Sequence, residues 1–176
     1  METHDLAAGS ELELLISMLG ATTRKWRREL GKVRDALVGR PAYPGGHNIG
    51  ALILHMAESE AWWVEHVSAG RKMTKEERVE LMEEETRQYG GRWPAPPKQP
   101  LDHFYAIQDR VRARTIETVR GLGDPAHTGK YGKEHEFTLR WVLHHVIQHE
   151  AYHGGQAVLA KMLAQRAARR PSSSEE

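Results

Sequence analysis

Apolar residues recur every three or four positions along four long stretches of the chain, which is the spacing of amphipathic helices. The first stretch runs from Ser10, a predicted N-cap, to about Val38. The others run from about Asn48 to Val67, from about Leu101 to Leu122, and from near Thr138 to about Ala168. In the first stretch we expect the core to be formed by Leu12, Leu15, Leu19, Thr22, Trp26, Leu30, Val33 and Leu37.

The segments between these stretches carry turn and breaker signals. Residues 39–46, which include two prolines, predict a loop. Thr74 to Glu77 form a capping-box pattern that opens a short acidic helix to about Gln88. Residues 90–100 hold four prolines and predict a crossover or lid without helix. Residues 121–137 are rich in glycine and polar residues, and either a small hairpin or a long loop would suit them.

This arrangement predicts an all-α fold, a four-helix bundle with a short extra helix and a proline-rich crossover between the second and third long helices. We expect residues 1–170 to form one domain and residues 171–176 to form a flexible tail.

The charge and composition of the chain narrow the classes of function. Lys and Arg number 25 against 24 for Asp and Glu, so the sequence gives no electrostatic reason to expect nucleic acid or a membrane as partner. The absence of cysteine excludes disulfides and thiolate metal ligands. The N-terminal residues lack the charged and apolar regions of a signal peptide, which favours a cytoplasmic location.

Three histidines lie four residues apart on the fourth predicted helix: His145, His149 and His153. Residues at this spacing share one helix face, which Val142 and Ala160 mark as core-facing. A buried imidazole needs a partner, and two on successive turns can bind one metal ion. The pattern therefore predicts a metal site, although a single core histidine would more often be hydrogen-bonded.

A site with two histidines needs a further ligand. His55 on the second helix is the candidate, because Ser59, Trp62 and His66 share its side and suggest a cleft wall. The alternative is a boundary histidine bonded to a neighbour. Three imidazoles would leave a coordination position open, as in catalytic zinc sites, and nickel or iron(II) would also accept nitrogen ligands.

Residues 149–153 also match the HExxH pattern of zinc peptidases, with Glu150 as the general base. The metzincin extension fails, because Gln156 and Leu159 stand where glycine and histidine are needed. A di-iron bundle needs two Glu-x-x-His motifs, and the sequence supplies one.

The segments Leu54-His55-Met56-Ala57-Glu58-Ser59-Glu60-Ala61-Trp62 and His149-Glu150-Ala151-Tyr152-His153-Gly154-Gly155-Gln156 together resemble the DinB/YfiT-like superfamily of small bacterial metalloproteins. The resemblance covers about Ser10 to Leu163 and implies an up-down-down-up bundle, usually dimeric. It implies one divalent metal ion (zinc, nickel or iron) per chain, bound by His55, His149 and His153. Glu150 is then the candidate catalytic residue, and the residues expected around the pocket are His145, Tyr152, Gln156, Ser59 and Trp62. Gly154 departs from the pattern, since relatives often have a basic residue there, so the identity of any anionic ligand is open.

Characterised relatives include metal-dependent transferases and isomerases that use low-molecular-weight thiols. The resemblance therefore implies a thiol S-transferase acting on a small electrophile, in detoxification or a stress response, in which the metal lowers the pKa of the thiol. The alternatives are a non-catalytic metal- or ligand-binding stress protein, a metal-dependent hydrolase of the HExxH type, and a structural bundle whose histidines bond to one another.

Overall fold

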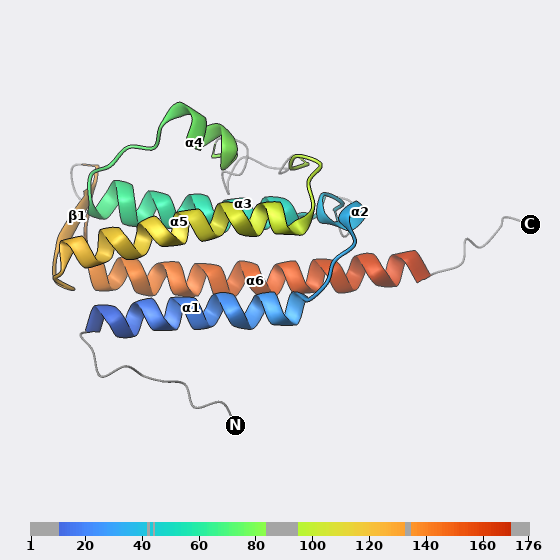
Figure 1. Cartoon of the computed structure of the whole chain (residues 1–176), viewed down its shortest axis with the longest axis horizontal. Helices are drawn as coiled ribbons and strands as arrows, with labels where there is room; N and C mark the ends of the chain where they lie inside the picture. The colour runs from blue at the N-terminus through green and yellow to red at the C-terminus, as the bar shows by residue number, and fades with distance from the viewer. Residues whose placement is uncertain (1–10, 42, 44, 84–94, 133–134, 170–176) are drawn as a thin grey trace, which may run out of the picture.

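The computed structural model describes residues 11–41, 43, 45–83, 95–132 and 135–169 of the chain. Its long helices are α1 (Glu11–Leu30), α3 (Ile49–Ala61), α5 (Leu101–Leu122) and α6 (Leu139–Arg169). A π-helix, η1 (Trp62–Ser68), continues α3. The chain runs in one direction along α1 and α6 and in the opposite direction along α3 and α5 (Figure 1). The prediction of an all-α, up-down-down-up four-helix bundle is confirmed, and the predicted bounds of the third long helix agree with α5.

Shorter elements connect the long helices: α2 (Asp35–Val38) and a β-hairpin lie at opposite ends of the bundle, and α4 (Lys75–Glu80) lies alongside α3 (Figure 1). Helix α2 precedes α3, and α4 follows η1 with the predicted capping box, in which Thr74 and Glu77 bond reciprocally. Strands β1 (Thr128–Tyr131) and β2 (His135–Thr138) form an antiparallel hairpin. Of the two arrangements predicted for residues 121–137, a small hairpin and a long loop, the structure has the hairpin. A Cβ atom on Gly129 would overlap the carbonyl oxygen of Val67, so glycine lets the hairpin lie directly against η1.

Three predicted details of the helices are wrong. The first helix ends at Leu30 because Gly31 adopts a positive φ of 55° and donates its backbone N–H to the carbonyl of Arg27, which is a common way to end a helix. The buried threonine of α1 is Thr23 and not Thr22. The acidic helix α4 ends at Glu80 rather than near residue 88, with Met82 at a positive φ of 54°.

The apolar core of the bundle consists of two clusters along its length. One lies toward α2 and is built around Trp26, Ile53 and Phe104, and the other lies toward the hairpin and is built around Leu19, Val64 and Leu143. Between them every long helix contributes buried or half-buried polar groups to one layer: Thr23, Glu60, Gln108, Arg112 and Glu150. The histidine triad described below lies on the same middle stretch of α3 and α6.

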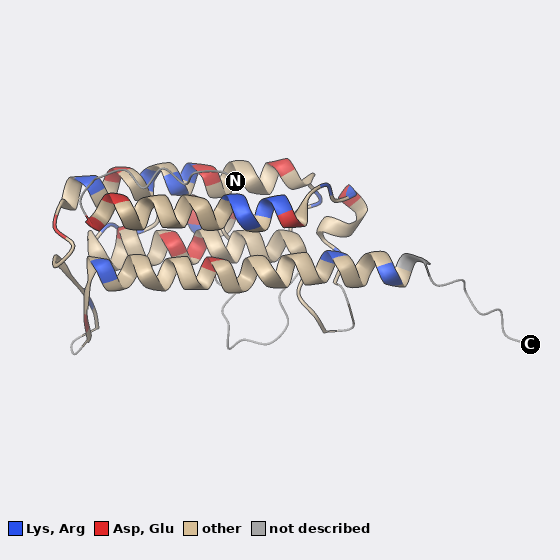
Figure 2. Cartoon of the chain, turned by 90° about the horizontal axis from the view of Figure 1, so that it is seen from below, with Lys and Arg blue, Asp and Glu red and all other residues tan. Residues whose placement is uncertain are grey.

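Charged residues are concentrated on α1 and α5, whereas α3 and α6 are mostly uncharged (Figure 2). Among the described residues no helix is both long enough and apolar enough to cross a membrane. The predicted N-cap Ser10, residues 84–88 of the acidic helix, residues 90–94 of the crossover and the tail all lie outside the described residues. The division into a domain of residues 1–170 and a tail therefore stays a prediction.

Candidate metal centre

Three histidines from two helices meet in the middle of the bundle. His55 projects from α3, and His149 and His153 project from successive turns of α6. The Nε2 atoms of His55 and His149 are 3.1 Å apart, and one ligand nitrogen from each of the three rings lies within 4.8 Å of the others. Two nitrogens bound to one tetrahedral zinc ion at its usual bond length are roughly 3.3 Å apart, so this donor set fits a divalent cation.

Polar groups lie beside two of these rings. Nδ1 of His153 is 2.7 Å from the amide oxygen of Gln156. Because an amide oxygen only accepts, Nδ1 carries the proton and Nε2 keeps its lone pair for a ligand. Nδ1 of His55 lies 3.9 Å from a carboxylate oxygen of Glu58. A hydrogen bond such as that from His153 to Gln156 fixes the tautomer of a histidine that binds a metal.

The surroundings keep all three imidazoles neutral. Burial, with smaller contributions from the nearby His153 and His47, lowers the pKa of His55 to about 4. Burial also lowers the pKa of His149 to about 2, helped by His153, His55 and His145. The pKa of His153 is lowered by burial, although its bond to Gln156 acts in the opposite direction. A neutral imidazole offers a lone pair, so metal binding at neutral pH would displace no proton from these rings.

The five residues predicted around the pocket take different positions. Gln156 bonds to His153, and the exposed Tyr152 packs its ring 4.9 Å from the His153 ring. His145 stacks on Trp141 at 5.1 Å and lies 6.0 Å from His149, next to the triad rather than in it. Ser59 is buried one turn after His55 on α3.

Trp62, the fifth of these residues, lies two turns beyond His55 and packs against Tyr131 at 4.9 Å. It lines a cavity of about 330 Å³ together with His66, Lys72, Met73, Arg78 and Glu83. His47, which precedes α3, is half-buried and close enough to influence the pKa values of His55 and His153.

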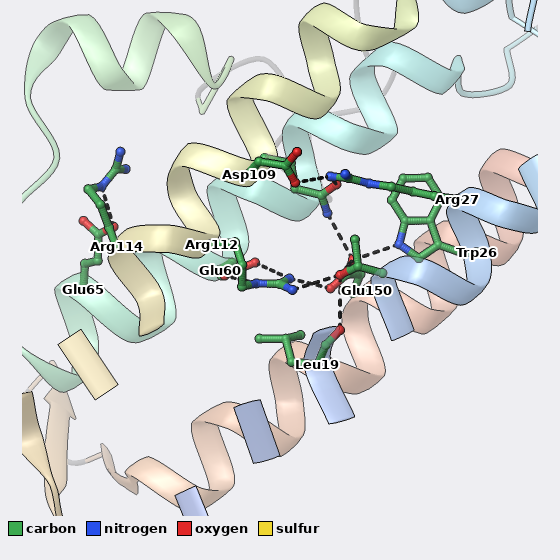
Figure 3. A network of polar contacts seen from close by, with 11 residues as sticks. Leu19, Trp26, Arg27, Glu60, Glu65, Asp109, Arg112, Arg114 and Glu150 are labelled. Atoms are coloured by element: carbon green, nitrogen blue, oxygen red, sulfur yellow. Dashed lines mark hydrogen bonds and ion pairs between the residues drawn. The ribbon is translucent and has the colours of Figure 1, made fainter. Parts of the chain in front are cut away.

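Glu150, the predicted catalytic base, is 2% exposed, and its carboxylate accepts four hydrogen bonds. Trp26 and Thr23 of α1 donate at 2.8 and 2.7 Å, Gln108 of α5 donates at 3.1 Å, and Arg112 of α5 donates at 2.7 Å (Figure 3). These contacts lie on the side of α6 that faces α1 and α5. The role of Glu150 as a base stays a prediction. Its contacts indicate a structural role instead, in which Glu150 joins α6 to α1 and α5.

The partners of Glu150 were not among the predicted site residues. Arg112 also binds both carboxylate oxygens of Glu60 on α3, at 2.7 and 2.8 Å. One signal was available in the sequence: Glu150 interrupts an apolar stripe of α6 that includes Val146 and Ala157, so a buried carboxylate was to be expected there.

The departure at Gly154 has a packing explanation in this structure. A Cβ atom there would lie 2.5 Å from Cγ of Trp26 and 2.8 Å from its Cβ, closer than atoms can pack. Position 154 therefore faces α1, away from the triad. The absence of a basic side chain at this position allows the close contact between α1 and α6.

The fold and the site define a class: a four-helix bundle with a His₃ group that is suited to one divalent metal ion. Residues 14–163 match the sequence profile of the mycothiol S-transferase family, and the chain belongs to this family of DinB-like proteins. No curated protein matches the chain.

Proposed function

We propose that this protein is a metal-dependent enzyme that transfers a low-molecular-weight thiol to a small electrophile. The observation that carries the proposal is the convergence of His55, His149 and His153, all neutral, in a chain of the mycothiol S-transferase family. When bound, a divalent cation supplies a Lewis acid that lowers the pKa of a thiol and makes it nucleophilic at neutral pH. Zinc, nickel and iron(II) all suit three nitrogen ligands.

The residues of the chain would hold and enclose the reactants. Gln156 keeps the imidazole of His153 oriented through its hydrogen bond, and the carboxylate of Glu58 lies 3.9 Å from the ring of His55. Aromatic rings flank that triad: His145 with its stacked partner Trp141 on one side and the exposed Tyr152 on the other. These rings offer flat surfaces beside the triad against which a substrate could pack.

The cavity beside Trp62 has room for a small molecule, and its lining residues belong to the segment after His55 rather than to the triad itself. Its volume of about 330 Å³ lies at the lower end of the range for ligand pockets. Indole and imidazole rings of Trp62 and His66 form part of its wall, together with the cationic side chains of Lys72 and Arg78. We further propose a cytoplasmic homodimer, without nucleic-acid or membrane partners, which acts in detoxification or a stress response.

A metal-dependent hydrolase is the second candidate, and the contacts of Glu150 argue against it. The general base of an HExxH site must reach a water molecule beside the metal. The carboxylate of Glu150 is instead bonded to four side chains that approach from α1 and α5. A non-catalytic binding protein would share the triad, so activity measurements decide between it and the transferase.

The test is a conjugation assay on purified protein reconstituted with Zn²⁺, Ni²⁺ or Fe²⁺. A panel of thiols that includes mycothiol, bacillithiol and cysteine is combined with a chromogenic aryl halide, and product is measured by absorbance. The transferase proposal predicts metal-dependent conjugation with at least one thiol, and its loss in His149→Ala. Full metal loading without conjugation of any thiol would favour the non-catalytic alternative, and hydrolysis of esters in its place would favour the hydrolase.

A further inference from the structure

Arg112 of α5 joins the two helices that carry the histidine triad (Figure 3). Its Nε and Nη2 atoms donate to the two carboxylate oxygens of Glu60 on α3, at 2.7 and 2.8 Å. Nη2 also donates to Oε2 of Glu150 on α6 at 2.7 Å, and Nη1 donates to Thr23 on α1 at 2.9 Å. A single guanidinium group therefore touches three other helices of the bundle.

The carboxylates that Arg112 binds are close in sequence to the metal ligands. Glu150 directly follows His149, and Glu60 follows His55 by five residues. At about 100° per residue, each carboxylate leaves its helix roughly 100° to 140° away from the histidine, on the side facing the bundle interior. The ligands and the ion pairs thus occupy different faces of the same two helices, within about one and a half helical turns of each other. Any sliding or rotation that moved the histidines would also strain the ion pairs.

These ion pairs are directional and poorly hydrated. Glu60 and Glu150 are 1% and 2% exposed, and the Arg112 side chain is 12% exposed. A planar guanidinium accepts few geometries with a carboxylate, whereas apolar side chains tolerate small axial shifts. Apolar clusters lie on both sides of this polar layer. Within the layer, where apolar packing is interrupted, the bonds of Arg112 fix the position of α3 relative to α6.

Trp26 adds a second constraint at the same level. Its indole Nε1 donates to Glu150 at 2.8 Å, and its ring occupies the space left by the missing side chain of Gly154. Glu150 and Gly154 lie on either side of His153 in the sequence. The part of α6 that bears the ligands is therefore held against α1 by packing and against α3 through Arg112.

We propose that Arg112 is a positioning residue of the metal centre: by bridging Glu60 to Glu150 it sets the register of α3 against α6, and so the distance of the His55 ring from those of His149 and His153. This proposal rests on the proposed metal site. Arg112 contacts neither the metal nor the substrate in this role, and it acts through the backbones of the two helices.

The experiment compares Arg112→Met with Arg114→Met. Arg114 lies on the same helix, but it forms ion pairs with the buried Glu65 of η1 at 2.9 Å and with Glu77 of α4 at 3.5 Å rather than with a residue of α6. The dissociation constant for Co²⁺ is measured by competition with a chelator, at a temperature where each protein is folded. The ligand-field spectrum of the Co²⁺ protein reports the arrangement of the ligands, and unfolding curves record stability separately.

We expect Arg112→Met to weaken Co²⁺ binding about tenfold, the lower end of the losses seen when outer groups of metal sites are removed, and to shift the spectrum. Arg114→Met should lose stability with an unchanged spectrum and affinity. Arg112→Lys, which keeps the charge but not the planar fork, should fold and give an intermediate affinity, so it serves if the methionine variant does not fold.

Wild-type affinity and spectrum in both Arg112 variants would overturn the positioning role while leaving the metal site intact. Equal losses of affinity in Arg112→Met and Arg114→Met would overturn it as well, because they would reflect general destabilisation. If the wild-type protein itself bound no Co²⁺, the metal site and the positioning role would fail together.

Discussion

Two adjacent glycines of α6 should respond to the same substitution in opposite ways. A Cβ atom on Gly154 would lie 2.5 to 2.9 Å from three atoms of Trp26, whereas one on Gly155 would meet nothing within 4 Å. Both residues lie inside the helix, so alanine gains about 1 kcal/mol of helix propensity at either position. The comparison therefore isolates the contact between α1 and α6.

The magnitude for Gly154→Ala follows from two destabilising effects and one stabilising effect. Overpacking of a close contact costs about 1–3 kcal/mol. Moving the indole also weakens its hydrogen bond to Glu150, and bonds to charged groups contribute about 1.5–3 kcal/mol. After subtracting the gain in helix propensity, we expect Gly154→Ala to lower the free energy of unfolding by about 2 kcal/mol. Gly155→Ala should raise it by about 1 kcal/mol.

Denaturant unfolding followed by circular dichroism gives both free energies, and thermal unfolding provides a check. For a chain of this size, 1 kcal/mol corresponds to a shift in Tm of about 2–4 °C. Equal changes of the same sign in the two variants would refute the argument that Gly154 is required by its contact with Trp26.

Three further predictions concern the histidine triad and the short helix α4. Gln156→Leu removes the acceptor for Nδ1 of His153 and should weaken Zn²⁺ binding about tenfold in a chelator competition. Unchanged affinity for Zn²⁺ would show that Gln156 does not support the site. In EDTA, which removes any bound metal, the free energy of unfolding should fall as the pH drops from about 6.5 toward 4. Histidines of the unfolded chain, with a pKa near 6.5, take up protons in this range. In the folded protein His55 (pKa about 4) and His149 (pKa about 2) do not. At pH 5 this amounts to about 2 kcal/mol for each histidine, and a double His55→Gln, His149→Gln variant with undiminished pH dependence would contradict it. Thr74→Ala breaks the capping box of α4 and should cost about 1 kcal/mol locally, seen as faster amide exchange in α4 with an unchanged global unfolding midpoint.

Local patterns in the sequence predicted those parts of the molecule that local physics determines. The four-residue spacing of His149 and His153 placed both rings on one face of α6, and the polar side of the second helix singled out His55. The predicted bounds of the third long helix were correct because its apolar period continues as far as the terminating Gly123.

The remaining features depend on contacts between residues far apart in the chain. Arg112 lies 52 positions from Glu60 and 38 from Glu150, so no local spacing marks their association. The apolar period continued past Gly31, and this masked the end of α1, where the backbone takes a positive φ. The contact that explains Gly154 likewise becomes visible only when α1 and α6 are packed together.

The metal content of the purified, untagged protein tests the central claim most directly. Elemental analysis is performed on the wild type and on His55→Ala and His149→Ala, after reconstitution with Zn²⁺ or Ni²⁺ and removal of loosely bound ions. A site shared by α3 and α6 predicts about one metal ion per chain in the wild type and its loss in both variants. Retention of the metal in His55→Ala would remove α3 from the site, and the absence of metal from reconstituted wild-type protein would contradict the account as a whole.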